Sequence, residues 1–128
     1  MILLLDTSTP TCKLTLVEDA NIYEYEWLAD RQLAKGLLEF IVGKLAEHSV
    51  DVKALKGMGL MRGPGSFTGL RIGATVLNTI ATFEYVPIVG VTGDDWQERA
   101  LELLRSGQND QIVTPEYGRE ARITKPRK

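Results

Sequence analysis

A glycine- and proline-rich run near the middle of the chain constrains its fold more than any other stretch. The run spans residues 62–73 and reads RGPGSFTGLRIG. A short apolar segment, 58–61, precedes it, and residues 74–81 after it carry apolar side chains at helical spacing. Glycine and proline favour tight turns, and Ser66 or Thr68 can cap a following helix. The sequence therefore predicts a strand, a tight turn and a helix, whose N-terminus could bind an anion.

Neither common nucleotide-binding motif fits this run. A P-loop needs lysine and then serine or threonine directly after its second glycine, whereas Leu70 and Arg71 follow Gly69. The dinucleotide fingerprint G-x-G-x-x-G also fails, because Gly63, Gly65 and Gly69 are spaced G-x-G-x-x-x-G. The run could bind a ligand, or it could be a turn that only lets the helix pack on the sheet. The residues alone do not distinguish these two interpretations.

The first 27 residues predict an antiparallel meander of three strands. Residues 2–5 are all apolar, as expected of a buried central strand, and a polar turn follows them. Residues 11–17 alternate apolar and polar side chains, which predicts one wet face, and residues 22–27 are rich in Ile, Tyr and Trp. Residues 57–61 and 87–91 predict two further short strands, the last parallel to the first.

The first helix is predicted from an Asp30 cap to about Glu47, and the last helix, capped by Thr92 with Asp95, ends at Gly107. A brief helical turn is expected within residues 50–55. The first helix carries two apolar stripes at four-residue spacing, and a surface helix needs only one buried face. The excess predicts contact with both the sheet and a partner helix. The stripes are Leu33, Leu37, Ile41 and Leu45, and beside them Ala34, Leu38, Val42 and Ala46.

Composition limits the class of protein. The chain has 128 residues, 44% hydrophobic and 25% charged, which is typical of one globular domain. No apolar run is long enough to cross a membrane, and residues 2–5 lack the features of a signal peptide. The single cysteine, Cys12, has no partner for a disulfide and suits a reducing cytosol. With His48 as the only histidine and no Cys/His cluster, we expect no metal site.

The charge of the chain is unevenly placed. The net charge of −2 argues against general binding of nucleic acid. The last thirteen residues nevertheless hold five basic side chains and two acidic ones. We expect a solvated tail in preference to a contact with nucleic acid or a partner. The basic residues are Arg119, Arg122, Lys125, Arg127 and Lys128.

Two segments together resemble the TsaB (YeaZ) family, which supplies the non-catalytic partner in bacterial threonylcarbamoyladenosine modification of tRNA. They are GPGSFTGLRIG at 63–73 and DTST at 6–9. The resemblance covers about residues 1–105 as the amino-terminal half of the family, and 115–119 with 123–126 resemble its carboxy-terminal tail. The second lobe that lies between these pieces in the family is expected to be missing. We therefore expect an amino-terminal lobe at 1–107 and a tail at 108–128.

The resemblance implies an α/β fold, a single actin-like or RNase H-like lobe with a five-stranded mixed sheet and helices on both faces. It implies a scaffold that binds and stabilises a TsaD-like transferase, which acts with a TsaE-like ATPase in t6A37 modification. The scaffold would be cytoplasmic, would contact tRNA only indirectly and would use no cofactor. No residue is assigned to catalysis, and nothing in this chain matches the metal-binding histidine pair of TsaD.

The resemblance also indicates three groups of residues. The family loop is expected to be structural first, with Arg71 bonded to loop carbonyls. Residues 6–9 correspond to the first phosphate turn of actin-like folds and are expected to be vestigial. The first helix and the helix that follows the glycine- and proline-rich run are expected to face TsaD or a second copy. The groups are the loop residues Gly63, Pro64, Gly65, Ser66, Phe67, Thr68, Gly69 and Arg71, the turn Asp6, Thr7, Ser8 and Thr9, and the partner interface Leu33, Leu37, Leu38, Ile41, Leu45, Leu70, Leu77 and Ile80.

Two other functions remain as alternatives. The first is a small nucleotide-binding ATPase or kinase that uses Asp6 and the hydroxyl groups of residues 7–9. The second is a homodimeric binding module with no role in tRNA modification. A peptidase is disfavoured, because no general base is expected near any serine.

Overall fold

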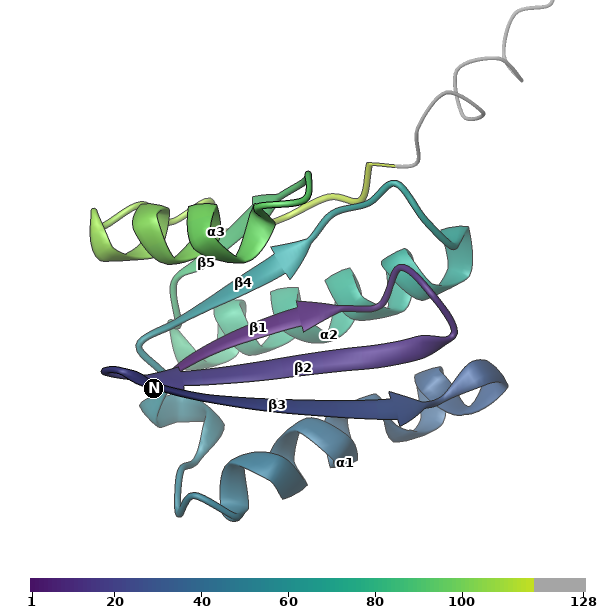
Figure 1. Ribbon diagram of the computed structural model, residues 1–128, viewed down its shortest axis with the longest axis horizontal. Coiled ribbons are helices and arrows are strands. Elements are labelled where there is room, and N and C mark those ends of the chain that lie inside the picture. Colours follow the sequence, from purple (N-terminus) through teal and green to yellow (C-terminus); the bar gives the residue numbers. More distant parts are fainter. Residues whose placement is uncertain (117–128) are drawn as a thin grey trace, which may run out of the picture.

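The computed structural model describes residues 1–116 as one five-stranded sheet with three α-helices (Figure 1). The order of strands across the sheet is β3-β2-β1-β4-β5. The basic tail and the family-like segments 117–119 and 123–126 lie outside the described residues. The elements are β1 (Ile2–Asp6), β2 (Thr11–Glu18), β3 (Asn21–Leu28), α1 (Leu33–Ala46), β4 (Gly57–Met61), α2 (Phe67–Glu84), β5 (Ile88–Val91) and α3 (Trp96–Arg105), with 3₁₀ turns at Asp30–Gln32 and Val52–Ala54.

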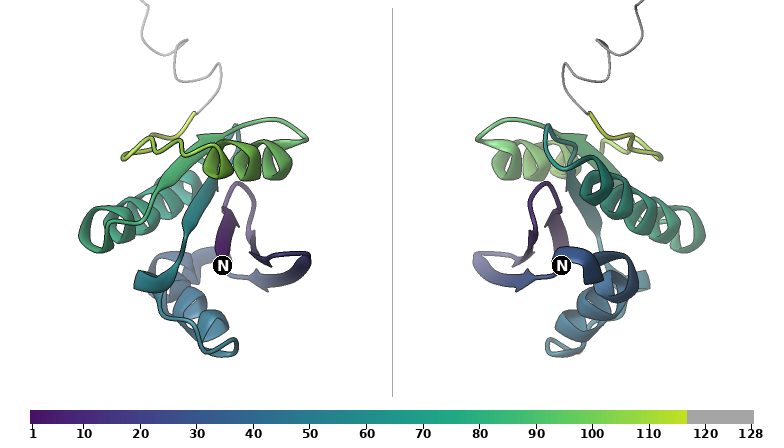
Figure 2. Two further views of the ribbon diagram at one scale, coloured as in Figure 1. Left: turned by 90° about the vertical axis from the view of Figure 1, so that its left-hand side faces the viewer. Right: turned by 90° about the vertical axis from the view of Figure 1, so that its right-hand side faces the viewer.

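The sheet is mixed, as predicted. β1 pairs antiparallel with β2, which pairs antiparallel with β3, while β1–β4 and β4–β5 are parallel. α1 and α2 cover one face and α3 covers the other (Figure 2). Because β1 is buried on both faces, Leu3, Leu4 and Leu5 all lie in the core, which explains the uninterrupted apolar run. The predicted α/β fold class is confirmed.

Two of the three predicted helix caps are wrong. Asp30 lies in a 3₁₀ turn with φ of 48°, and Gln32 precedes α1 without a side-chain cap bond. Thr92 does not cap α3 either: Gly93, with φ of 99°, follows it, and the N-cap is Asp95, whose side chain makes no cap bond. Ser66 does cap α2, since its Oγ accepts a hydrogen bond from Gly69 N at 3.2 Å.

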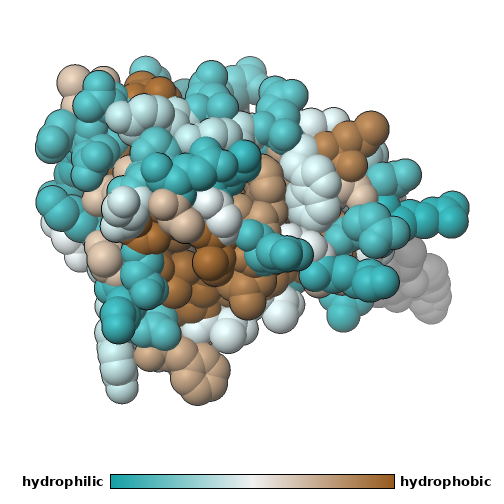
Figure 3. Space-filling model, turned by 90° about the horizontal axis from the view of Figure 1, so that it is seen from below, coloured by the Kyte–Doolittle hydropathy of each residue, from teal (hydrophilic) through white to brown (hydrophobic). Residues whose placement is uncertain are grey.

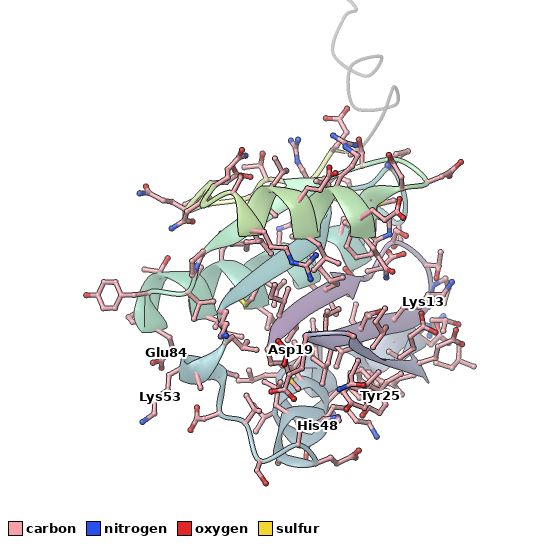
Figure 4. All side chains as sticks on the ribbon, turned by 60° about the vertical axis from the view of Figure 1, so that its left-hand side comes forward. Lys13, Asp19, Tyr25, His48, Lys53 and Glu84 are labelled. Atoms are coloured by element: carbon pink, nitrogen blue, oxygen red, sulfur yellow. The ribbon has the colours of Figure 1, made fainter. Side chains whose placement is uncertain are left out.

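The predicted wet face of β2 is partly covered. Thr15 is buried, because α3 crosses that side of the sheet and Gln97 Nε2 donates a hydrogen bond to Thr15 Oγ1 at 3.1 Å. On the opposite side, the end of α1 is attached to β3. His48 Nε2 lies 2.7 Å from the hydroxyl of Tyr25, and the two side chains meet below the sheet (Figure 4). The single histidine therefore has a structural contact.

Residues 108–116 return along β5 and form what we call the edge segment. Asp110 N donates a hydrogen bond to Ile88 O at 2.7 Å. The side-chain amide of Asn78 on α2 bonds both backbone groups of Val113, at 2.8 Å to the carbonyl oxygen and 2.9 Å to the nitrogen. Val113 is itself buried in the main core. This part of the predicted tail is thus packed against the sheet and α2.

Candidate functional site

The two family-like segments meet at one end of the sheet. The turn 6–9 follows β1 and the loop 62–66 follows β4, and these strands are parallel neighbours (Figure 1). Ser66 N donates a hydrogen bond to Ser8 O at 2.8 Å. Thr7 is fully buried, and its Oγ1 donates to Gly69 O at 2.8 Å. We call this contact between residues 6–9 and 62–73 the junction.

Glycine is required in the junction because two backbones approach closely there. A Cβ added to Gly65 would lie 2.5 Å from Ser8 Cβ, and one added to Gly69 would collide with the carbonyl oxygen of Thr7. A Cβ at Gly73 would collide with the hydroxyl of Thr7. The glycine spacing that fits no nucleotide motif therefore matches the shape of the neighbouring turn.

The polar groups of the turn are engaged within the chain. Asp6 Oδ1 accepts hydrogen bonds from Ser8 N at 2.9 Å and from Ser8 Oγ at 2.6 Å. Thr9 Oγ1 donates to Thr11 O at 3.1 Å. Together with Thr7, all three hydroxyls of the turn donate to protein atoms.

Cys12, on the strand that follows the turn, is buried and unsuited to act as a nucleophile. Burial, and to a lesser extent the charge of Asp6, raise the pKa of its thiol to about 12. The thiol is therefore protonated at neutral pH, whereas reactive cysteines need a stabilised thiolate.

Arg71 does not hold the loop as predicted. Its guanidinium lies 5.5 Å from the ring centre of Phe67, and within residues 1–116 it makes no hydrogen bond to a loop carbonyl. Arg62 instead links the start of the loop to the edge segment: its Nε donates to Thr114 O at 2.8 Å, and its backbone carbonyl accepts from Glu116 N at 2.7 Å. Sequence reasoning missed Arg62 and Asn78, because their partners lie far along the chain in a segment without a regular pattern.

The predicted partner interface needs a correction. Seven of its eight side chains are buried within the chain, and only Leu38, which is 52% exposed, reaches the surface. α1 turns its bulkier stripe toward the sheet, since burial of larger apolar side chains is more favourable. The seven buried residues are Leu33, Leu37, Ile41, Leu45, Leu70, Leu77 and Ile80.

The second stripe of α1 faces outward. Its four members are all exposed, and the first of them, Ala34, lines a groove together with the half-buried Ile72 and Val76 of α2. Apolar atoms gather in the middle of the surface seen from below, with hydrophilic side chains around them (Figure 3). We call this surface the α1–α2 face. Its residues are Ala34, Leu38, Val42 and Ala46 of α1, and Ile72 and Val76 of α2.

The α1–α2 face contains a groove of about 370 Å³ near the start of α2. Its lining is Ala34, Thr68, Arg71, Ile72, Thr75 and Val76. Within residues 1–116, no group of three or more His, Cys, Asp or Glu side chains is placed to hold a metal ion. None of the helices in that range is long and apolar enough to cross a membrane.

Comparison with known proteins gives consistent results. The family model described as "TsaD: tRNA N6-adenosine threonylcarbamoyltransferase" matches residues 27–122. The chain is 30% identical over 108 residues to the tRNA threonylcarbamoyladenosine biosynthesis protein TsaB of Haemophilus influenzae, covering 84% of this chain and 46% of that protein. It is also 30% identical over 91 residues to the TsaB of Escherichia coli, covering 71% of this chain and 39% of the relative.

A solved structure agrees with these relatives. YeaZ from Pseudomonas aeruginosa superposes with a TM-score of 0.66 at 32% sequence identity, covering 71% of this chain and 43% of that one. The chain thus spans less than half the length of the relatives it matches here.

Proposed function

The chain belongs to the TsaB (YeaZ) family, and we propose from this that it is a non-catalytic scaffold in tRNA threonylcarbamoyladenosine biosynthesis, binding a TsaD-like transferase. The names of its relatives support the pathway, because they describe threonylcarbamoyladenosine biosynthesis proteins. The TsaE-like ATPase and the tRNA would be engaged through the transferase, in the cytoplasm.

The observation that carries this proposal is the outward apolar stripe of α1. Leu38 and Val42 are 52% and 46% exposed on successive turns, although the same helix already supplies four buried side chains to the core. A contiguous exposed apolar surface commonly marks a protein interface. The half-buried Ile72 and Val76 of α2 widen that surface, so it can accept a helix from a partner.

The junction supports a non-catalytic role over the ATPase or kinase alternative. A phosphate bound at residues 6–9 would compete for hydroxyls that already donate to protein atoms, and for space next to the turn that Gly65 of the loop and Gly69 of α2 occupy. We propose that the turn 6–9 is a vestigial phosphate loop whose role is to hold the loop 62–66 in place. The exposed face also supports pairing of two copies when the transferase is absent, in competition with it.

Binding to a TsaD-like transferase tests the proposal. The unaltered chain should form a complex in size-exclusion chromatography and isothermal titration. Leu38→Glu should remain folded and lose binding, because the new carboxylate would be desolvated without a partner. Ile22→Glu is the matched control, since Ile22 is 61% exposed on β3 and lies outside the α1–α2 face.

Two results would contradict the proposal. Leu38→Glu that binds the transferase with unchanged affinity would show that this face is not the interface. Micromolar binding of ATP to the chain alone, abolished by Asp6→Ala, would favour the nucleotide-dependent enzyme.

A further inference from the structure

The groove on the α1–α2 face has one charged lining residue, Arg71. The other five are alanine, isoleucine, valine and two threonines, and no carboxylate lines the groove. Arg71 is exposed in the second turn of α2, close to the loop 62–66. The groove therefore combines apolar and hydroxyl side chains with one positive charge.

The guanidinium of Arg71 lies near an aromatic ring but has no counter-ion within residues 1–116. It lies 5.5 Å from the ring centre of Phe67, a cation–π arrangement that limits its freedom. The ion pairs of the described chain join Lys44 to Glu47 and Arg99 to Asp95, and neither involves Arg71. The positive charge is satisfied mainly by water while the face is open.

A partner that covers the α1–α2 face would remove the water that solvates Arg71. An apolar partner surface would remove water from the groove, and a desolvated guanidinium without an anionic partner is strongly unfavourable. The ring of Phe67 offsets only part of that cost. Carboxylate is the side-chain group that matches the planar fork of arginine with two parallel hydrogen bonds. The hydroxyls of Thr68 and Thr75 line the same groove and can donate further bonds.

We infer that this groove receives an aspartate or glutamate side chain from an otherwise apolar helix of the protein partner. The inference rests on the proposed function and adds the chemistry by which the partner is selected. A helix is favoured because the groove lies beside an apolar stripe with four-residue spacing, Ala34, Leu38 and Val42. A nucleic-acid backbone is disfavoured, because its binding depends on several cations and the groove offers one.

The test is the affinity of the chain for a TsaD-like transferase, measured by isothermal titration. Arg71→Met should weaken binding by about 30-fold or more, because truncating one member of a buried charge pair leaves the other unpaired. Arg71→Lys should recover part of the loss, since lysine keeps the charge but not the planar fork. Arg105→Met on α3 removes the same charge from the opposite side of the sheet and should leave affinity unchanged.

A charge reversal identifies the acidic residue. Arg71→Glu should abolish binding, and a lysine in place of one carboxylate on the transferase helix should restore it. All variants should keep the melting temperature of the unaltered chain, because Arg71 is exposed and makes no hydrogen bond within residues 1–116. Failure of every such lysine substitution to restore binding would overturn the inference.

The remaining outcomes separate this inference from the proposed function. If Leu38→Glu abolishes binding and Arg71→Met leaves affinity unchanged, the interface stands and the carboxylate site is wrong. If neither variant weakens binding, or the unaltered chain does not bind, both proposals fail. If Arg71→Met weakens a direct interaction with tRNA and spares the transferase, the groove binds phosphate and the inference is overturned.

Discussion

The junction and the α1–α2 face are built in opposite ways. In the junction, glycines bring two backbones together, Thr7 is fully buried, and the hydroxyls of the turn all donate within the chain. On the face, Leu38 is 52% exposed, and Arg71 has no ion-pair partner within residues 1–116. The most distinctive sequence motif therefore forms a closed structural contact, whereas the surface left open consists of common apolar residues with one arginine.

The same contrast exists within a single helix. Leu37 and Leu38 are neighbours on α1, yet Leu37 is fully buried and Leu38 is not. Residue type does not separate them, and helical spacing only assigns them to different stripes, so the direction in which α1 faces the sheet decides which one is buried. If burial determines stability, substitutions in the inner stripe should destabilise the chain and those in the outer stripe should not. The outer stripe would then be available for a partner.

The largest effect on stability is expected for Leu37→Ala. Removing a fully buried leucine side chain should lower the free energy of unfolding by about 3 kcal/mol. Leu38→Ala should change it by less than about 0.5 kcal/mol, because surface substitutions rarely exceed that. Urea unfolding of both variants measures the difference. Similar losses at the two positions would mean that α1 faces the sheet differently.

Gly69→Ala should lower the free energy of unfolding by about 2 kcal/mol. The new Cβ would collide with the carbonyl oxygen of Thr7, which is backbone and cannot move aside easily. The higher helix propensity of alanine offsets only part of this strain. Thermal unfolding measures the change, and an unaltered melting temperature would show that the junction is looser than described.

Thr7→Val should cost about 1 kcal/mol. Valine keeps the shape of threonine but removes the hydrogen bond to Gly69 O, and a typical hydrogen bond contributes about that much. Ser8→Ala, with a half-buried hydroxyl bonded to Asp6, is the comparison within the same turn. Chemical denaturation of both variants measures the cost. Increased stability of Thr7→Val would indicate that the buried hydroxyl is retained for a function other than stability.

Much of the fold could be predicted from local patterns. Uninterrupted apolar runs identified the buried strands, and glycines with a serine cap identified the strand, turn and helix around residue 66. Those signals are local, because strand burial and helix capping depend on neighbouring residues. The caps at Asp30 and Thr92 failed because backbone turns at Asp30 and Gly93 set the helix starts instead.

The candidate site was less predictable, because its contacts join distant residues. Thr7 and Gly69 are 62 positions apart, and Asn78 and Val113 are 35 apart. Helical spacing identified two apolar stripes on α1 but could not tell which one faces the sheet. The larger side chains of the inner stripe were the available signal, since they bury more apolar surface than alanine and valine.

The smallest effect is expected for Gly43→Ala, and it has the opposite sign to Gly69→Ala. Gly43 is exposed within α1, and a Cβ added there would meet no atom within 4 Å. Alanine should therefore raise the free energy of unfolding by about 0.5–1 kcal/mol, because glycine inside a helix loses more backbone entropy on folding. Urea unfolding of the two alanine variants compares the regions directly. A loss of stability in both would mean that α1 packs against atoms the described chain does not place there, and the α1–α2 face would not be open.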